Sequence, residues 1–258
     1  MKCTTAEMMT VAAARALSND DICFVGIGLP SAACNVARLT HAPGITLIYE
    51  SGTIRTRPQV LPLSIGDGEL CETALSTVSV PEMFRYWLQG WRITVGFLSG
   101  AQMDRFGNLN STVIGDYRQP TVRLPGSGGA TEIATSCGEI FIIMRQTVRS
   151  FVAKVDFLTS LGHGRNGTER AAAGVKTKGP TLAISDLCSM RSDPQTKEFV
   201  VQSLHPAVTR EQVRENTGWE IRFAENVEET PPPNRMELET LRELNERTAA
   251  AHGVTVGD

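Results

Sequence analysis

The chain has 258 residues, 41% of them hydrophobic and 21% charged, and its formal net charge is −3. This length suits one α/β domain or two small domains, and no basic surface is expected to hold nucleic acid or an anionic membrane. Residues 4–17 carry Glu7 and Arg15 within an apolar stretch, which is not typical of a signal peptide, so we expect a cytoplasmic protein. The longest uncharged run, residues 22–37, is too short and too interrupted to span a membrane.

The N-terminal quarter alternates between helix and strand patterns. Residues 4–17 predict an amphipathic helix, with Thr4 and Glu7 as a capping box. Residues 21–28 predict a buried strand, residues 30–40 a helix, and residues 45–49 a second strand. This order predicts an α/β fold with a mostly parallel sheet and helices on its faces.

The middle of the chain continues the alternation. Residues 80–90 predict a helix ended by Gly90, and residues 92–100 a strand. The segment 101–115 has turn signals between extended pieces and predicts a hairpin. A helix at 129–137 and a strand at 139–145 follow. Residues 151–160 alternate in polarity, which predicts another strand or an extended segment before a loop at 161–167.

The last part of the chain predicts strands at 179–186, 198–205 and 219–224, with a helix at 209–218 before the third. A Pro-rich stretch then acts as a stiff linker. It leads to a final helix with four apolar residues on one side, namely Met236, Leu238, Leu241 and Leu244. We therefore expect one α/β domain over residues 1–228 and an appended linker and helix over residues 229–258.

Cysteine and histidine spacing argues against a metal site. The six cysteines lie at positions 3, 23, 34, 71, 137 and 188, without a Cys-x-x-Cys pair. The four histidines show no ligand spacing. We expect buried, reduced thiols, no metal and no disulfides.

An acidic residue directly follows the strand at residues 45–49. Glu50 is succeeded by a Ser51-Gly52 turn. One interpretation is a surface loop, and the other is a reactive carboxylate held at the mouth of a sheet. Ligands of open α/β sheets bind at the carboxyl ends of strands, which is where Glu50 is expected.

Two further turns carry several glycines. Gly26 and Gly28 join a strand to a helix, where backbone N–H groups can face an anion or simply form a tight connection. A dinucleotide site competes here, because Glu50 stands at the ribose position of a Rossmann fold, but Pro30 disfavours it. Gly126, Gly128 and Gly129 precede another helix, and their N–H groups are candidates for stabilising an oxyanion or a phosphate. The alternative for this turn is a flexible hinge.

Five segments together are recognisable. They are "LIYESG", "AQMDRFGNLNSTVIGDY", "RLPGSGGATEIA", "IIMRQTVRSFVAKVDFLTSLGHG" and "LHPAVTREQVRENTGWEI", in this order. They closely resemble the B (beta) subunit of class I coenzyme A transferases, in particular the glutaconate CoA-transferase type. The resemblance runs from about Glu7 to Phe223 and leaves out the tail.

The resemblance implies a three-layer α/β sandwich of the NagB/RpiA/CoA-transferase type, as in ribose-5-phosphate isomerases. It also implies an A (alpha) subunit of similar fold, an A2B2 assembly, and an active site between the subunits. The nucleophile of the glutaconate type would be Glu50 here, in Tyr49-Glu50-Ser51-Gly52. This departs from the Ser-Glu-Asn-Gly motif of many other class I enzymes.

The implied reaction moves CoA from an acyl-CoA to a free carboxylic acid through a glutamyl-CoA thioester, with no permanently bound cofactor. The three glycine turns and Ser51 are then expected to bind CoA or substrate, or to stabilise oxyanions. Three arginines are available to a dicarboxylate, namely Arg55, Arg57 and Arg123. The alternatives are an acyl-CoA hydrolase, a ring-opening hydrolase or a decarboxylase that uses Glu50 as a general base, and a non-catalytic member of the fold.

Overall fold

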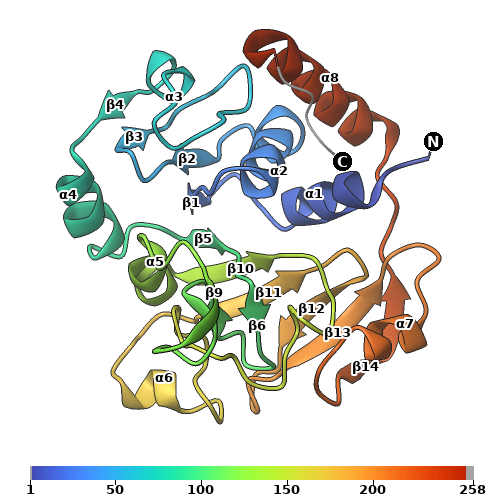
Figure 1. Cartoon of the computed structure of the whole chain (residues 1–258). Coiled ribbons are helices and arrows are strands. Elements are labelled where there is room, and N and C mark those ends of the chain that lie inside the picture. The colour runs from blue at the N-terminus through green and yellow to red at the C-terminus, as the bar shows by residue number, and fades with distance from the viewer. Residues whose placement is uncertain (1, 254–258) are drawn as a thin grey trace. The chain divides into compact units, whose positions relative to one another are not determined.

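The computed structural model describes residues 2–253, and the chain divides into two compact units (Figure 1). The first unit takes in residues 2–97 and 232–253, and the second takes in Leu98–Pro231. No helix in the described part of the chain is long and apolar enough to cross a membrane.

The first unit is built on parallel strands. Its strands are β1 (Ile22–Phe24), β2 (Thr46–Ile48), β3 (Thr53–Ile54), β4 (Ser76–Thr77) and the start of β5 (Val95–Leu98). Strand β1 lies between β2 and β5 and pairs with both in parallel. Strands β3 and β4 extend the β2 edge in antiparallel fashion. Its helices are α1 (Thr5–Arg15), α2 (Leu29–Leu39), α3 (Glu69–Glu72), α4 (Val80–Glu82) and α8 (Arg235–His252).

Helices α1, α2 and α8 pack against one another in this unit (Figure 1). The predicted capping box of α1 is present at Thr4 and Glu7. Arg15 of α1 forms an ion pair of 2.6 Å with Glu237 of α8. Of the four apolar residues expected on one side of α8, Met236 is instead 56% exposed. It lies two residues before Leu238, about 200° around the helix, so the two cannot share a face.

The second unit contains β6 (Gln102–Met103), β7 (Leu109–Asn110), β8 (Val113–Gly115), β9 (Pro120–Arg123) and β10 (Glu139–Ile143). Its other strands are β11 (Pro180–Ile184), β12 (Cys188–Ser192), β13 (Phe199–Leu204) and β14 (Arg222–Glu229). The helices are α5 (Ala130–Ser136), α6 (Glu169–Ala172) and α7 (Arg210–Glu215). Strands β10 to β14 lie in chain order, with parallel pairs at β10–β11 and β13–β14 and antiparallel pairs between.

At four places the structure differs from the local expectations or decides between them. Strand β12 is not among the predicted strands, and β14 runs to Glu229, into the expected linker. Residues 151–160 make isolated bridges at Phe151 and Ser160 and form no strand, so the alternative of an extended segment holds. The helix expected at 80–90 is split into α4 and the π-helical turn η1 (Met83–Leu88). Gly90 follows it, where a Cβ atom would lie 2.1 Å from the carbonyl oxygen of Tyr86.

Candidate active site

The carboxyl ends of two adjacent parallel strands place two of the predicted segments side by side in the first unit. Strand β1 leads into the Gly26–Gly28 turn and then α2, and β2 leads into the Tyr49–Gly52 turn and then β3. The N–H of Val25 donates to the carbonyl of Ile48 at 2.9 Å and extends the pairing to the point where both turns begin. This is the edge of a parallel sheet at which ligands of α/β proteins bind.

Glu50 lies in a tight turn closed by backbone hydrogen bonds. The N–H of Gly52 donates to the carbonyl of Tyr49 at 3.0 Å, and the N–H of Tyr49 donates to the carbonyl of Thr53 at 3.1 Å. Glu50 itself is half-buried. The turn therefore fixes the backbone that carries the carboxylate and leaves the residue partly accessible.

Gly52 is required by this turn. Its φ of +107° is a conformation that L side chains rarely adopt, and a Cβ atom there would lie 1.9 Å from the carbonyl oxygen of Val78. The N–H of Val78 donates to the carbonyl of Gly52 at 2.9 Å. Because both backbone groups of Gly52 are hydrogen-bonded, the structure explains this glycine by close backbone approach rather than by a free N–H donor.

Two hydroxyl groups beside Glu50 lack partners. The side-chain oxygens of Ser51 and Thr53 are buried, and neither has a hydrogen-bond partner among residues 2–253. Most buried polar atoms in proteins are hydrogen-bonded, so two such hydroxyls within one turn are unusual. Ser51 is one of the predicted site residues. Thr53 is not, because nothing in the sequence marks its hydroxyl as unpaired.

The Gly26–Gly28 turn offers free backbone donors. Gly28 is the N-cap of α2, has φ +81°, and makes no side-chain capping bond. A Cβ atom at Gly28 would meet no atom within 4 Å. Within the described residues, the N–H groups of Gly26 and Gly28 have no hydrogen-bond partner. An anionic oxygen at this end of α2 would thus meet unpaired N–H groups and the positive end of the helix dipole.

The third predicted turn, Gly126–Gly129, belongs to the second unit. Gly126 and Gly128 have φ values of +100° and +46°, with open space where their Cβ atoms would be. The N–H of Gly126 donates to the carbonyl of Ser111 at 2.9 Å. The N–H groups of Gly128 and Gly129 have no partner within residues 2–253. Whether this turn faces Glu50 stays a prediction.

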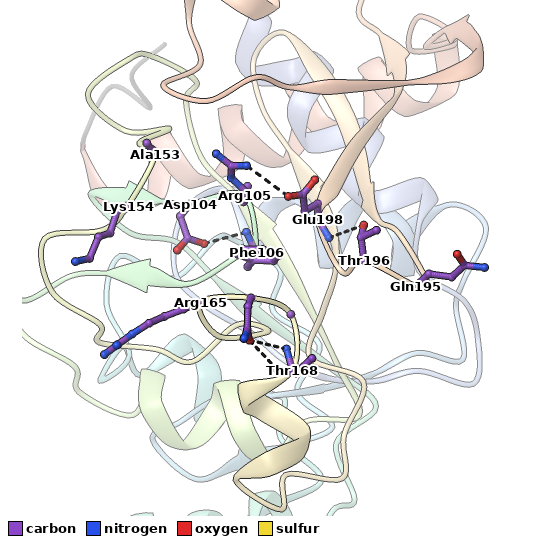
Figure 2. Close-up of a pocket in the computed structure, with 12 residues that line it drawn as sticks. Asp104, Arg105, Phe106, Ala153, Lys154, Arg165, Thr168, Gln195, Thr196 and Glu198 are labelled. Carbon is purple, nitrogen blue, oxygen red and sulfur yellow. Dashed lines mark hydrogen bonds and ion pairs between the residues drawn. The ribbon is translucent and has the colours of Figure 1, made fainter.

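A separate cavity of about 750 Å³ lies in the second unit and contains none of the predicted site residues (Figure 2). The Asp104 carboxylate, at its wall, accepts hydrogen bonds from the N–H groups of Phe106 and Asn108. Burial raises the pKa of Asp104, although these hydrogen bonds oppose the shift. Arg105 faces Glu198 at 3.5 Å (Figure 2). These charged groups are thus satisfied by their neighbours.

Comparison with known proteins decides the family. Residues 6–216 match the sequence profile of the family described as coenzyme A transferase. The chain belongs to the coenzyme A transferase family. The predicted resemblance and the CoA-transferase activity are therefore confirmed. The competing dinucleotide interpretation of Glu50 is not supported by this membership.

Two relatives and one solved structure refine the assignment. The chain is 62% identical to the B subunit of 3-oxoadipate CoA-transferase from Pseudomonas knackmussii, over 99% of this chain and 98% of that protein. It is 36% identical to the B subunit of glutaconate CoA-transferase from Acidaminococcus fermentans, over 91% and 90%. The crystal structure of glutaconate coenzyme A-transferase from A. fermentans matches with a TM-score of 0.90 at 30% identity, over 100% of this chain and 98% of that chain.

These matches confirm the predicted α/β fold class and the assignment as the beta subunit of a CoA-transferase of the glutaconate type. The match to the P. knackmussii protein also covers nearly the whole chain, so the tail left out by the predicted resemblance is shared with that relative.

Proposed function

We propose that Glu50 is the nucleophile of this CoA-transferase. The observation that carries the proposal is the Tyr49–Gly52 turn. It holds a half-buried carboxylate at the carboxyl end of a parallel strand, beside a second turn with unpaired N–H groups. A carboxylate is a weak nucleophile in water, and a partly closed site with fixed donors favours its attack on a thioester.

The reaction proceeds by double displacement. A carboxylate oxygen of Glu50 attacks the acyl carbon of the donor, the C–S bond breaks, and CoA leaves as a thiolate, so that the acyl group and Glu50 form a mixed anhydride. The thiolate attacks the Glu50 carbonyl carbon, releases the donor acid as a carboxylate, and forms glutamyl-CoA. The acceptor carboxylate then reverses both steps, so no proton and no redox cofactor are consumed.

Each tetrahedral intermediate carries an oxyanion that needs hydrogen-bond donors. The donors we propose for Glu50 are the unpaired N–H groups of Gly26 and Gly28, with the Ser51 hydroxyl. For Gly128 and Gly129, in the second unit, we propose that their unpaired N–H groups bind CoA or substrate. Loss of one such donor typically costs about 3 kcal/mol of transition-state stabilisation.

Two of the predicted glycines are not proposed as hydrogen-bond donors. The N–H groups of Gly52 and Gly126 already donate to backbone carbonyls, so these residues shape their turns and let substrate approach. The absence of a side chain at these positions serves geometry, and no donor is assigned to them.

The substrate we propose is a 3-oxo dicarboxylic acid and its CoA thioester, because a relative named as part of a 3-oxoadipate CoA-transferase is 62% identical to this chain. A dicarboxylate needs a cation for its second carboxylate. Of the three predicted arginines, Arg123 donates to the Tyr117 carbonyl at 2.8 Å and Arg57 reaches the Pro43 carbonyl at 3.5 Å. Arg55 alone has no hydrogen bond or ion pair within residues 2–253.

The assembly we propose is A2B2, with an A subunit completing the active site. Both relatives named above are B subunits, and the matches cover 98% and 90% of their lengths. Each copy of this chain would then bring its Glu50 to one of the two active sites.

Trapping of the covalent intermediate tests the nucleophile. The complex of this chain with its A subunit is given acyl-CoA without an acceptor, and borohydride or hydroxylamine is added. We expect reduction or hydroxamate formation on the peptide that contains Glu50, detected by mass spectrometry. Glu50→Gln retains size and much of the hydrogen bonding but lacks the anionic oxygen, so this variant should be unmarked and inactive.

The same experiment separates the alternative chemistry. If Glu50 is a general base for hydrolysis, Glu50→Gln still loses activity, but the wild-type protein never forms an adduct. An unmodified Glu50 peptide under conditions of measured turnover and trapping would remove the nucleophile assignment. Release of free CoA without transfer to an added acid would indicate a hydrolase.

A further inference from the structure

A chain of buried hydrogen bonds runs from the residue before Glu50 into helix α2. Tyr49, Ser31 and Asn35 are all fully buried, with 0% of each exposed. The phenol oxygen of Tyr49 lies 2.7 Å from the hydroxyl oxygen of Ser31. The side-chain amide of Asn35 donates to the Ser31 carbonyl at 2.9 Å. Tyr49 is therefore joined to the first two turns of α2.

These hydrogen bonds continue to the segment that follows β3, at the other end of the β2–β3 hairpin. Arg38 donates its Nε and Nη2 groups to the Asn35 amide oxygen at 3.1 and 3.0 Å. Its Nη2 also donates to the carbonyl of Pro58 at 2.8 Å. Tyr49 precedes the Glu50 turn and Pro58 follows β3, so the network attaches the β2–β3 hairpin to α2 at two points.

Tyr49 also closes the Glu50 turn through its backbone. Its carbonyl accepts from Gly52 and its N–H donates to Thr53. A shift of the Tyr49 ring would therefore move the base of the turn that carries Glu50. Helix α2 begins directly after the Gly28 donor, so the bond between Ser31 and Tyr49 links the oxyanion donors to the carboxylate.

Core packing alone does not require this hydroxyl pair. A phenylalanine at position 49 would fill nearly the same volume, and replacing both partners of a buried hydrogen bond by apolar groups is often nearly neutral for stability. Burial also raises the pKa of Tyr49, so its phenol stays protonated and acts as a neutral hydrogen-bonding group. The hydrogen bond between Tyr49 and Ser31 instead fixes the distance between the Glu50 turn and the start of α2.

We propose that Tyr49 is a positioning residue for Glu50, and that its hydrogen bond to Ser31 sets the carboxylate against the Gly26–Gly28 donors. The inference rests on the proposed role of Glu50 as nucleophile. Tyr49 contacts no substrate in this proposal, and it acts through the geometry of the turn. A misplacement of about 1 Å in a reacting group can cost about a hundredfold in rate.

The test compares Tyr49→Phe, Ser31→Ala and the double variant, each assembled with the A subunit. The rate of adduct formation is measured at saturating acyl-CoA by quenched trapping, together with the KM for acyl-CoA and the melting temperature. We expect each variant to slow adduct formation by roughly tenfold to a hundredfold, with KM changed less than about threefold. Because both single variants remove the same bond, the double variant should be no slower than either.

Tyr86→Phe is the matched control, because Tyr86 is 57% exposed and outside the network. It should keep the wild-type rate. If Tyr49→Phe and Ser31→Ala lower the melting temperature but form the adduct at the wild-type rate, the pair is structural and the inference is wrong. If Tyr49→Phe does not assemble, Ser31→Ala alone decides by the same criterion. Absence of any adduct in the active wild-type complex would instead overturn the proposed function, and the inference with it.

Discussion

Substitution of Gly52 by alanine should strongly destabilise the first unit. The alanine would have to adopt φ +107°, and its Cβ atom would lie 1.9 Å from the carbonyl oxygen of Val78. That oxygen belongs to the backbone, so no side-chain rotation relieves the contact. Relief requires moving Val78, which breaks its 2.9 Å hydrogen bond to Gly52 and strains the pairing of β3 with β4.

The cost can be worked out from these contacts. The unfavourable φ costs about 1–2 kcal/mol, and the lost hydrogen bond with its strand pairing costs about another 2 kcal/mol. A total of about 3–4 kcal/mol lowers the melting temperature of a chain of this size by about 10 °C. Gly253→Ala is the matched control in the same unit: Gly253 has φ +62°, and its Cβ atom would meet nothing within 4 Å. Strain alone predicts a fall of about 3 °C there.

The assay is thermal unfolding of both variants under identical conditions, followed by adduct trapping in the assembled complex. Gly52→Ala should lose adduct formation even at temperatures where it is folded, because the turn that carries Glu50 must move. Gly253→Ala should form the adduct at the wild-type rate. Equal melting temperatures for the two variants, or a normal adduct rate in Gly52→Ala, would refute the role of the close backbone contact.

Three further predictions concern assembly, the Gly126–Gly129 turn and pH. The purified chain alone should transfer no CoA, and activity should appear on mixing with the A subunit; transfer by the lone chain would contradict the shared site. Gly128→Val should lower turnover about tenfold or more but the melting temperature by only a few degrees, because this glycine is exposed, and failure to fold would instead make its turn structural. Burial lowers the pKa of His163 and His205 below 6.5, so the unfolded chain binds protons that the folded chain does not. The contribution of these two histidines to the free energy of unfolding should be fully present above pH 6.5 and fall as the pH is lowered. In His205→Gln the melting temperature should fall less steeply with pH. A melting temperature that does not change between pH 7.5 and 5.5 would contradict this.

Local signals in the sequence predict the parts of the fold that local interactions determine. The predicted capping box at Thr4 is present, because a cap is made by residues three positions apart. Strand β12 escapes prediction because Cys188–Ser192 is short and has no β-branched or aromatic residue, and the strand forms by pairing with β11 on one side and β13 on the other. The extension of β14 to Glu229 has the same cause. It forms by pairing with β13, and its charged residues alone do not predict a strand.

In the candidate site, too, features set by local sequence are predictable and features set by distant residues are not. Glu50 at the end of a strand is predictable, because an apolar run followed by Glu-Ser-Gly is a local pattern. The reason for Gly52 is not, because it depends on Val78, which is distant in the sequence. The unpaired hydroxyl of Thr53 and the bond between Tyr49 and Ser31 likewise exist only when the chain is folded.

The rigidity of the Glu50 turn bears on which of the two chemistries it suits. A nucleophilic carboxylate must touch the acyl carbon, whereas a general base must stand back by the width of one water molecule, about 3 Å. The backbone of Tyr49 is hydrogen-bonded to Gly52 and Thr53, and its side chain to Ser31, so the base of the turn is held on two sides. A turn fixed in this way favours a single attack distance. Loosening it would admit water between the carboxylate and the thioester, which would cost transfer more than hydrolysis. If Glu50 is the nucleophile that we propose, the hydrogen bond between Tyr49 and Ser31 serves CoA transfer as well as stability.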